Sequence, residues 1–184
     1  MELKISSPNS AGNPPAAHFS GSPSWTLKHE LAEEISDALA LGKQAHLFYI
    51  GDYNPAGFFS IEFPFLEDVA FLAKRFFKIE LRYAFGKRFF YERLGVLPED
   101  FKKFGLYRIP IPEKDVNVPK YHALTAVGFG AEADALPVEE LRRRVEEAIN
   151  RYLPKAEYAR LVRIEEMERE TIRQILESWT EKSV

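Results

Sequence analysis

The chain has 184 residues, of which 46% are apolar, and it carries 25 basic against 28 acidic side chains. This length fits one domain, or one domain with an appendage, and is enough to bury a hydrophobic core. The chain contains no cysteine. This absence excludes disulfide scaffolds, thiol nucleophiles, iron–sulfur clusters and every metal site built on cysteine sulfur.

Neither a membrane span nor a signal peptide is evident in the sequence. No run approaches the ~18 consecutive apolar residues that cross a bilayer, and the N-terminal residues lack the apolar core of a signal peptide. We therefore expect a soluble, cytoplasmic protein with no membrane partner.

The net charge of −3 conceals a segregated distribution. Residues 1–73 hold 3 basic and 9 acidic side chains, whereas residues 74–103 hold 9 basic and 4 acidic ones. An overall acidic chain thus has a basic middle segment, which could attract a polyanion locally.

The first ordered element expected is a helix over residues 25–41. The preceding residues are rich in Ser, Pro, Gly and Asn without an apolar period, which predicts a flexible arm over residues 1–23. Ser24 is a suitable N-cap and Gly42 a suitable helix stop. Apolar side chains then recur at every fourth position: Leu27, Leu31, Ile35 and Leu39.

A short apolar run at residues 45–50 predicts a buried strand of a parallel sheet. Residues 51–57, with two glycines, a proline and polar side chains, predict a tight loop directly after it. Pro64 is expected to break the following apolar stretch into a turn and then a helix over residues 65–76.

Further strands are predicted at residues 79–85, 89–94 and 124–129. A short helix should begin at Pro98 and stop at Gly105. Three prolines mark an irregular connection before the last strand: Pro110, Pro112 and Pro119.

Two amphipathic helices should complete the chain, one from Pro137 to Tyr152 and one after Pro154. The order of elements predicts an α/β fold with a mostly parallel sheet flanked by helices. We expect this α/β domain to cover residues 24–153 and a helical extension to cover residues 154–184.

Two of the predicted loops carry acidic residues beyond the ends of strands. Asp52 is followed two residues later by Asn54, and Glu132 is followed two residues later by Asp134. In extended chain such pairs point the same way, so each could present two oxygens to one point. A cluster of this kind suits Mg²⁺, which prefers oxygen ligands. The alternative for Asp52 is a turn residue that bonds its own backbone, and for Glu132 and Asp134 it is helix-start capping.

The segment from Leu47 to Gly57, LFYIGDYNPAG, resembles the YIGD-x-DPSG signature of a TOPRIM-like family, which is related to the type VI topoisomerase A subunit and to bacterial primases. Three other stretches are similar to the family in the same order. They are GSPS before the first helix, PEDFKKFGL from Pro98, and EADALP from Glu132. Together these stretches span residues 20–153.

The resemblance implies a Rossmann-like domain whose acidic cluster holds Mg²⁺, or Mn²⁺, for phosphoryl chemistry on nucleic acid. Asp52 matches the first aspartate of the D-x-D motif, while Glu132 and Asp134 match the family's ELD. The resemblance therefore gives these three residues catalytic roles and includes Asn54 among the metal ligands. Lys114 lies near a family lysine that could touch phosphate.

The chain departs from the family pattern in two places. Asn54 replaces the second aspartate of the motif, and no strand–helix unit bearing the family's first glutamate precedes the signature, where Glu2 is the only acid ahead of Glu30. Because fewer carboxylates lower the affinity for a divalent ion, weak or absent activity in this chain alone is expected. The domain would then act in a larger DNA-processing system with a partner chain. Two rival hypotheses remain: a non-catalytic TOPRIM-like binding or assembly module, and an unrelated α/β protein with acidic turns.

Basic and aromatic residues alternate through residues 74–103. Cations can neutralise phosphates while aromatic rings stack on unpaired bases, so Lys87, Arg88 and Arg93 are candidates for nucleic-acid binding alongside Lys114. The alternative is that most of the aromatic residues belong to the core and the cations to a solvated face.

Overall fold

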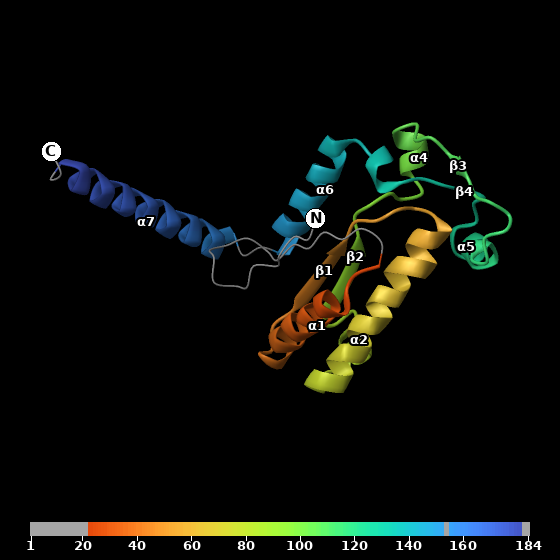
Figure 1. The fold of residues 1–184 in the computed structure, drawn as a ribbon, viewed down its shortest axis with the longest axis horizontal. Helices are drawn as coiled ribbons and strands as arrows, with labels where there is room; N and C mark the ends of the chain where they lie inside the picture. The colour runs from red at the N-terminus through yellow and green to blue at the C-terminus, as the bar shows by residue number, and fades with distance from the viewer. Residues whose placement is uncertain (1–21, 153–154, 182–184) are drawn as a thin grey trace. The chain divides into compact units, whose positions relative to one another are not determined.

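A computed structural model describes residues 22–152 and 155–181 of the chain, which form an α/β protein (Figure 1). The described residues divide into two compact units, one ending at Glu146 and the other beginning at Glu147, within helix α6 (Val138–Tyr152). The predicted arm lies almost wholly outside the described residues, as do Glu2 and the predicted domain boundary at residues 153–154.

The first helix and the two central strands agree with the sequence prediction. Helix α1 (Trp25–Ala40) begins at Ser24, whose side chain accepts a hydrogen bond of 3.2 Å from the Leu27 amide. Strands β1 (Ala45–Tyr49) and β2 (Phe89–Arg93) pair in parallel. The register places Ala45 opposite Phe89 and Tyr49 opposite Arg93, so both strands end at the same edge.

The helix predicted over residues 65–76 is confirmed, but the turn expected before it at Pro64 is wrong. A π-helical segment, η1 (Gly57–Glu62), leads directly into helix α2 (Phe63–Phe77). Pro64 lies in the first turn of α2, where the fixed φ of proline suits a helix and its missing N–H is not required.

The strand predicted at residues 79–85 is also wrong. Lys78 adopts a left-handed conformation with φ of 61° and ends α2, after which the chain forms the short helix α3 (Leu81–Ala84). Only one side of the segment is buried: Leu81 is 4% exposed, whereas Tyr83 is 74% and Phe85 is 58% exposed. The segment is thus a surface turn that Leu81 anchors to the core, with Ile79 and Ala84 partly buried against the same cluster.

Most of the strand predicted at residues 124–129 is absent, because residues 124 and 125 end a helix, residues 126–128 are irregular and only Phe129 lies in a strand. Helix α5 (Val118–Thr125) begins with Pro119 in its first turn and ends at Ala126, which has a φ of 56°. What remains is the short strand β4 (Phe129–Gly130), paired antiparallel with β3 (Ile109–Pro110). Among the described residues the parallel sheet therefore has two strands, fewer than the sequence predicted.

The short helix after Pro98 is confirmed as α4 (Asp100–Lys103) and is tied to α6. The fully buried Asp100 forms an ion pair with Arg144, whose guanidinium also donates to the Gly95 carbonyl at 2.8 Å. Glu140, one helical turn earlier, accepts hydrogen bonds from Arg143 and Arg144. These hydrogen bonds, those from Arg143 foremost, lower the pKa of Glu140 to about 2.

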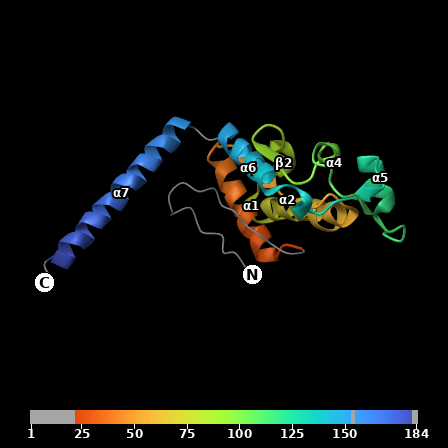
Figure 2. The same cartoon turned by 90° about the horizontal axis from the view of Figure 1, so that it is seen from above.

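Two hydrophobic clusters support opposite ends of the first unit. One joins α1 and α2, which pack against each other (Figure 2), to Leu81 and to Phe89 of β2. The other gathers residues that are distant in sequence: Tyr53, Phe58, Val96, Phe101, Leu106, Tyr121, Ala131 and Leu136. The second cluster lies beneath the loop that follows β1, where the acidic residues occur.

The second unit contains the long helix α7 (Lys155–Glu181). Its described surface bears helical ion pairs, Arg169 with Glu165 at 2.6 Å and Arg173 with Glu170 at 2.9 Å. None of the described helices is long and apolar enough to cross a membrane.

Candidate functional site

The structure brings Asp52 and Glu132 together although 80 positions separate them in the sequence. Tyr53 and Ala131 form an antiparallel bridge, with N–H to carbonyl distances of 2.8 and 2.9 Å. In an antiparallel pair the residue before one partner faces the residue after the other, so Asp52 and Glu132 are neighbours. One carboxylate oxygen of Asp52 also accepts a hydrogen bond of 2.8 Å from the Ala133 amide. This contact caps the short 3₁₀ helix η2 (Ala133–Ala135).

The acidic groups of this site affect one another. The negative charge of Asp52 raises the pKa of Glu132, and burial, a hydrogen bond to Asp52 and the charge of Asp134 raise it further. Asp52 is half-buried, whereas Glu132 and Asp134 are exposed. The result is a patch of negative potential at the edge where β1 ends.

Asn54 has a structural role at this edge. Its side-chain oxygen accepts a hydrogen bond of 2.6 Å from the Gly57 amide, and its carbonyl accepts one of 3.1 Å from Phe58. These are the contacts of a helix N-cap. The side-chain oxygen of Asn54, which the resemblance included among the metal ligands, therefore already accepts a hydrogen bond from the backbone.

A buried ion pair fixes the loop that carries Asp52. The side chains of Arg93 and Glu62 are 10% and 3% exposed and form a salt bridge. Arg93 also donates to the carbonyls of Gly51, at 2.7 Å, and of Asp52. The Tyr91 hydroxyl donates to the other oxygen of Glu62. We call Glu62, Tyr91 and Arg93 the arginine platform.

The environment of the arginine platform favours neutral or paired groups. Burial raises the pKa of the Tyr91 hydroxyl and lowers that of the Arg93 guanidinium. The guanidinium lies 4.4 Å from the centre of the Phe58 ring, a cation–π arrangement. Because the positive charge is buried and paired, Arg93 supports the loop from within.

Two glycines let other backbone segments approach this loop closely. A Cβ on Gly95 would lie 2.4 Å from the Gly51 carbonyl oxygen, and one on Gly57 would lie 2.6 Å from that of Asp52. Either methyl group would overlap main-chain atoms that cannot move aside easily. The position of Asp52 therefore depends on the missing side chains of Gly57 and Gly95.

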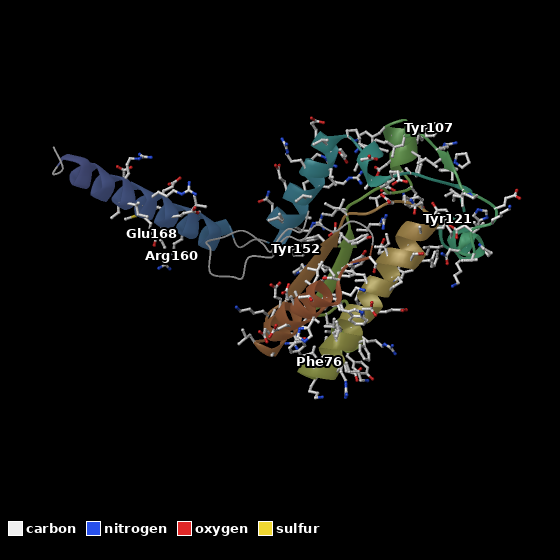
Figure 3. The ribbon with its side chains drawn as sticks, viewed as in Figure 1. Phe76, Tyr107, Tyr121, Tyr152, Arg160 and Glu168 are labelled. Atoms are coloured by element: carbon white, nitrogen blue, oxygen red, sulfur yellow. The ribbon has the colours of Figure 1, made fainter. Side chains whose placement is uncertain are left out.

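Tyr121 supports the same loop from helix α5 (Figure 3). It is fully buried, and its hydroxyl lies 2.9 Å from the Phe129 carbonyl oxygen and 3.3 Å from that of Tyr53. Burial and the neighbouring Tyr53 raise its pKa, so it remains a hydrogen-bond donor at neutral pH.

The four predicted nucleic-acid-binding residues occupy different environments. Arg93 belongs to the arginine platform. Lys87 and Arg88 are exposed before β2, at the opposite edge from Asp52, and Arg88 donates to the Leu39 carbonyl at 3.1 Å. Lys114 is exposed in the turn between β3 and α5. Of the four candidates, Arg93 is therefore buried and paired, whereas the other three are exposed at the surface.

Sequence reasoning missed Glu62, Tyr91, Tyr121 and Gly95. The sequence offered one clue, because Glu62 and Arg93 each lie in a largely aromatic and apolar run. A charged side chain that is buried with such a run is rarely left unpaired. Nothing in the local sequence indicated that these two charges were partners.

Within the two described segments, no group of three or more His, Asp or Glu side chains is arranged to hold a metal ion. Comparisons with protein-family models, curated proteins and solved structures found no match. The functional assignment therefore depends on the geometry of this edge and on the sequence resemblance.

Proposed function

We propose that the first unit is a TOPRIM-like domain that binds Mg²⁺, or Mn²⁺, at Asp52 and Glu132 and processes nucleic acid, DNA in particular, as part of a larger system. The observation that carries the proposal is the proximity of Asp52 and Glu132, created by the bridge between Tyr53 and Ala131. These residues belong to two separate motifs that resemble the family's metal-binding motifs.

The donor set fits a magnesium ion that keeps much of its water shell. Mg²⁺ in phosphoryl-transfer sites commonly uses one or two carboxylates, with water and substrate phosphate completing the coordination. Asp52 and Glu132 supply two carboxylates, and Asp134 adds negative charge nearby. Such an ion, when bound, stabilises negative charge on a phosphate and on its leaving oxygen.

The remaining residues of the edge position this pair. The arginine platform holds the carbonyls of Gly51 and Asp52, and the Ala133 amide orients the Asp52 carboxylate. A preorganised pair of carboxylates loses less conformational freedom when it captures an ion. This arrangement supports binding by two carboxylates where the family pattern has more.

Isothermal titration of the full chain with Mg²⁺ and with Mn²⁺ tests the site. We expect Asp52→Ala and Glu132→Ala each to weaken binding at least tenfold, whereas Glu139→Ala, which removes an exposed acid from α6, should bind like the parent protein. Equal binding by the parent and Asp52→Ala would remove the metal site from the proposal.

A second candidate function is a non-catalytic binding or assembly module of the same type. This candidate is favoured by the structural roles of Asp52 and Asn54. The Asp52 side chain accepts a hydrogen bond at the start of η2, and the Asn54 side chain accepts one at the start of η1. Incubation of plasmid DNA with the full chain and Mg²⁺ separates the candidates. Cleavage or relaxation that is lost in Asp52→Ala would exclude the module, while no reaction together with unimpaired metal binding would favour it.

A further inference from the structure

The end of the first unit opposite Asp52 carries an exposed surface that is both basic and aromatic. Its rings are Phe76, Tyr83 and Phe85, which are 57%, 74% and 58% exposed. Their neighbours in the sequence are exposed cations: Lys74, Arg75, Lys78, Arg82, Lys87 and Arg88. We call these nine residues the basic–aromatic surface.

The charge of this segment is strongly positive. Residues 74–88 contain six basic side chains and one acidic side chain, Glu80. Glu80 is paired with Lys74 at 2.6 Å, so it offsets a single cation. A polyanion is the partner with complementary charge.

The exposure of the aromatic rings indicates which kind of polyanion fits this surface. Leu81 and Phe89 anchor this segment to the core. Tyr83 presents its ring to solvent, and Phe85 remains 58% exposed although one side of its ring contacts Phe89 edge-on. Each ring lies within a few positions of several cations along the chain. Alternating rings and cations match the repeating bases and phosphates of an unpaired strand, whereas the bases of a duplex are already stacked on each other.

An anionic membrane surface fits this pattern less well. Helices that lie on membranes present a continuous apolar face several turns long. Here the exposed rings lie on the end of α2, on the four-residue helix α3 and on the residue that follows α3. Lys78 and Arg82 lie between Phe76 and Tyr83 along the chain, and Lys87 and Arg88 follow Phe85.

The surface is remote from the acidic site. Residues 85–88 precede β2, whereas Asp52 follows β1, and the two strands are parallel. Five residues of strand at ~3.3 Å each separate the two edges by roughly 16 Å. In Figure 3, Phe76 lies near one end of α2, and Tyr121 of α5 lies near the other end.

We propose that the basic–aromatic surface binds single-stranded nucleic acid, with Tyr83 and Phe85 stacking on bases and the surrounding cations contacting phosphates. This inference rests on the proposed function for the choice of nucleic acid as partner, and it adds the form of the substrate and the place of capture. A strand held here would need to extend along the unit to reach Asp52.

Fluorescence anisotropy of a labelled 20-nucleotide oligothymidylate tests the proposal on the full chain in EDTA. Tyr83→Ala and Phe85→Ala should each weaken binding about tenfold or more, as expected for the loss of one stacked base. Tyr83→Trp should retain binding. Tyr107→Ala is the matched control, because Tyr107 is 76% exposed but lies outside this surface.

The salt dependence of binding tests the cations separately. Replacing both Arg82 and Lys87 with Gln should reduce the slope of log K against log salt concentration by about 1.4, since each single-strand phosphate contact contributes about 0.7. The same replacements at Lys102 and Lys120, exposed cations on α4 and α5, should leave the slope unchanged.

Three outcomes would overturn the proposal. They are parent-like binding by Tyr83→Ala and Phe85→Ala, equal weakening by Tyr107→Ala, and Tyr83-dependent binding to phosphatidylserine vesicles in place of the oligonucleotide. Because the assay contains EDTA, Asp52→Ala should bind the oligonucleotide like the parent protein. Loss of the metal site with intact oligonucleotide binding would refute the proposed function alone, and the reverse result would refute only this surface.

Discussion

The two edges of the β1–β2 pair use basic residues in opposite ways. At the edge where the strands end, Arg93 is buried, paired with Glu62 and bonded to the carbonyls of the Asp52 loop. At the edge where they begin, Lys87 and Arg88 are exposed beside aromatic rings. The comparison shows that burial decides whether an arginine or lysine supports the fold or is available to a partner. Substitution of the buried Arg93 should therefore change stability, and substitutions at the basic–aromatic surface should change nucleic-acid binding.

The largest loss of stability is expected for Arg93→Met. Removing one member of a buried ion pair leaves Glu62 as an uncompensated buried charge, which costs about 3–5 kcal/mol. Urea denaturation should report a fall of this size in the free energy of unfolding. The double variant Arg93→Met with Glu62→Gln should recover part of the loss, because it removes the stranded charge. Equal stability of the single and double variants would contradict the assigned pairing.

Gly95→Ala should be the next most damaging change. The added methyl group would overlap the Gly51 backbone, and overpacking of this kind costs about 1–3 kcal/mol. Gly128→Ala is the matched control, since its nearest neighbour would be the His122 side chain at 3.6 Å, an ordinary contact. Thermal unfolding of both variants measures the difference, and similar melting temperatures would argue against the close approach.

Asn54→Ala should cost about 1 kcal/mol, the usual value of an N-cap, because the Gly57 amide loses its acceptor. Asn117→Ala provides the comparison. Asn117 occupies the N-cap of α5 without a side-chain capping bond, so its replacement should have little effect. If both variants lost the same stability in urea titrations, the capping role of Asn54 would be wrong.

A smaller, pH-dependent effect is expected from Glu132. Its pKa is raised in the folded state, so the folded protein holds its proton more tightly than the unfolded chain does. The associated stability is fully present below the ordinary pKa of about 4.5 and is lost as pH rises through the folded value. Asp52→Asn and Glu132→Gln should both flatten this part of the stability curve when unfolding is measured at a series of pH values. A curve unchanged by both substitutions would show that the two carboxylates do not interact.

The smallest effect on stability is expected at the basic–aromatic surface. Tyr83→Ala and Phe85→Ala change exposed side chains, and such changes usually alter stability by less than about 0.5 kcal/mol. Denaturation midpoints should therefore match those of the parent protein even where oligonucleotide binding is lost. A large loss of stability would show that these rings belong to the fold and would weaken the contrast between the two edges.

Local sequence predicted the elements that have strong periodicity or clear punctuation. The helix after Ser24, the strand before Gly51 and the helix after Pro137 are where their apolar patterns and caps indicated. The strand prediction at residues 79–85 was wrong and the one at residues 124–129 held only at Phe129, because short apolar runs fit a strand and an irregular surface segment equally well. Only the presence or absence of a neighbouring strand distinguishes them.

The sequence by itself determined which acidic groups are available at the edge of the sheet, because Asp52 and Glu132 lie in loops that it predicts after strands. Tertiary structure decided that they meet, through the backbone bridge between Tyr53 and Ala131. It also decided that Arg93, at the end of β2, is buried, whereas Lys87, two residues before the start of β2, is exposed. The physical reason is that charge and hydrophobicity are properties of single residues, while pairing and burial depend on segments that are brought together only when the chain folds.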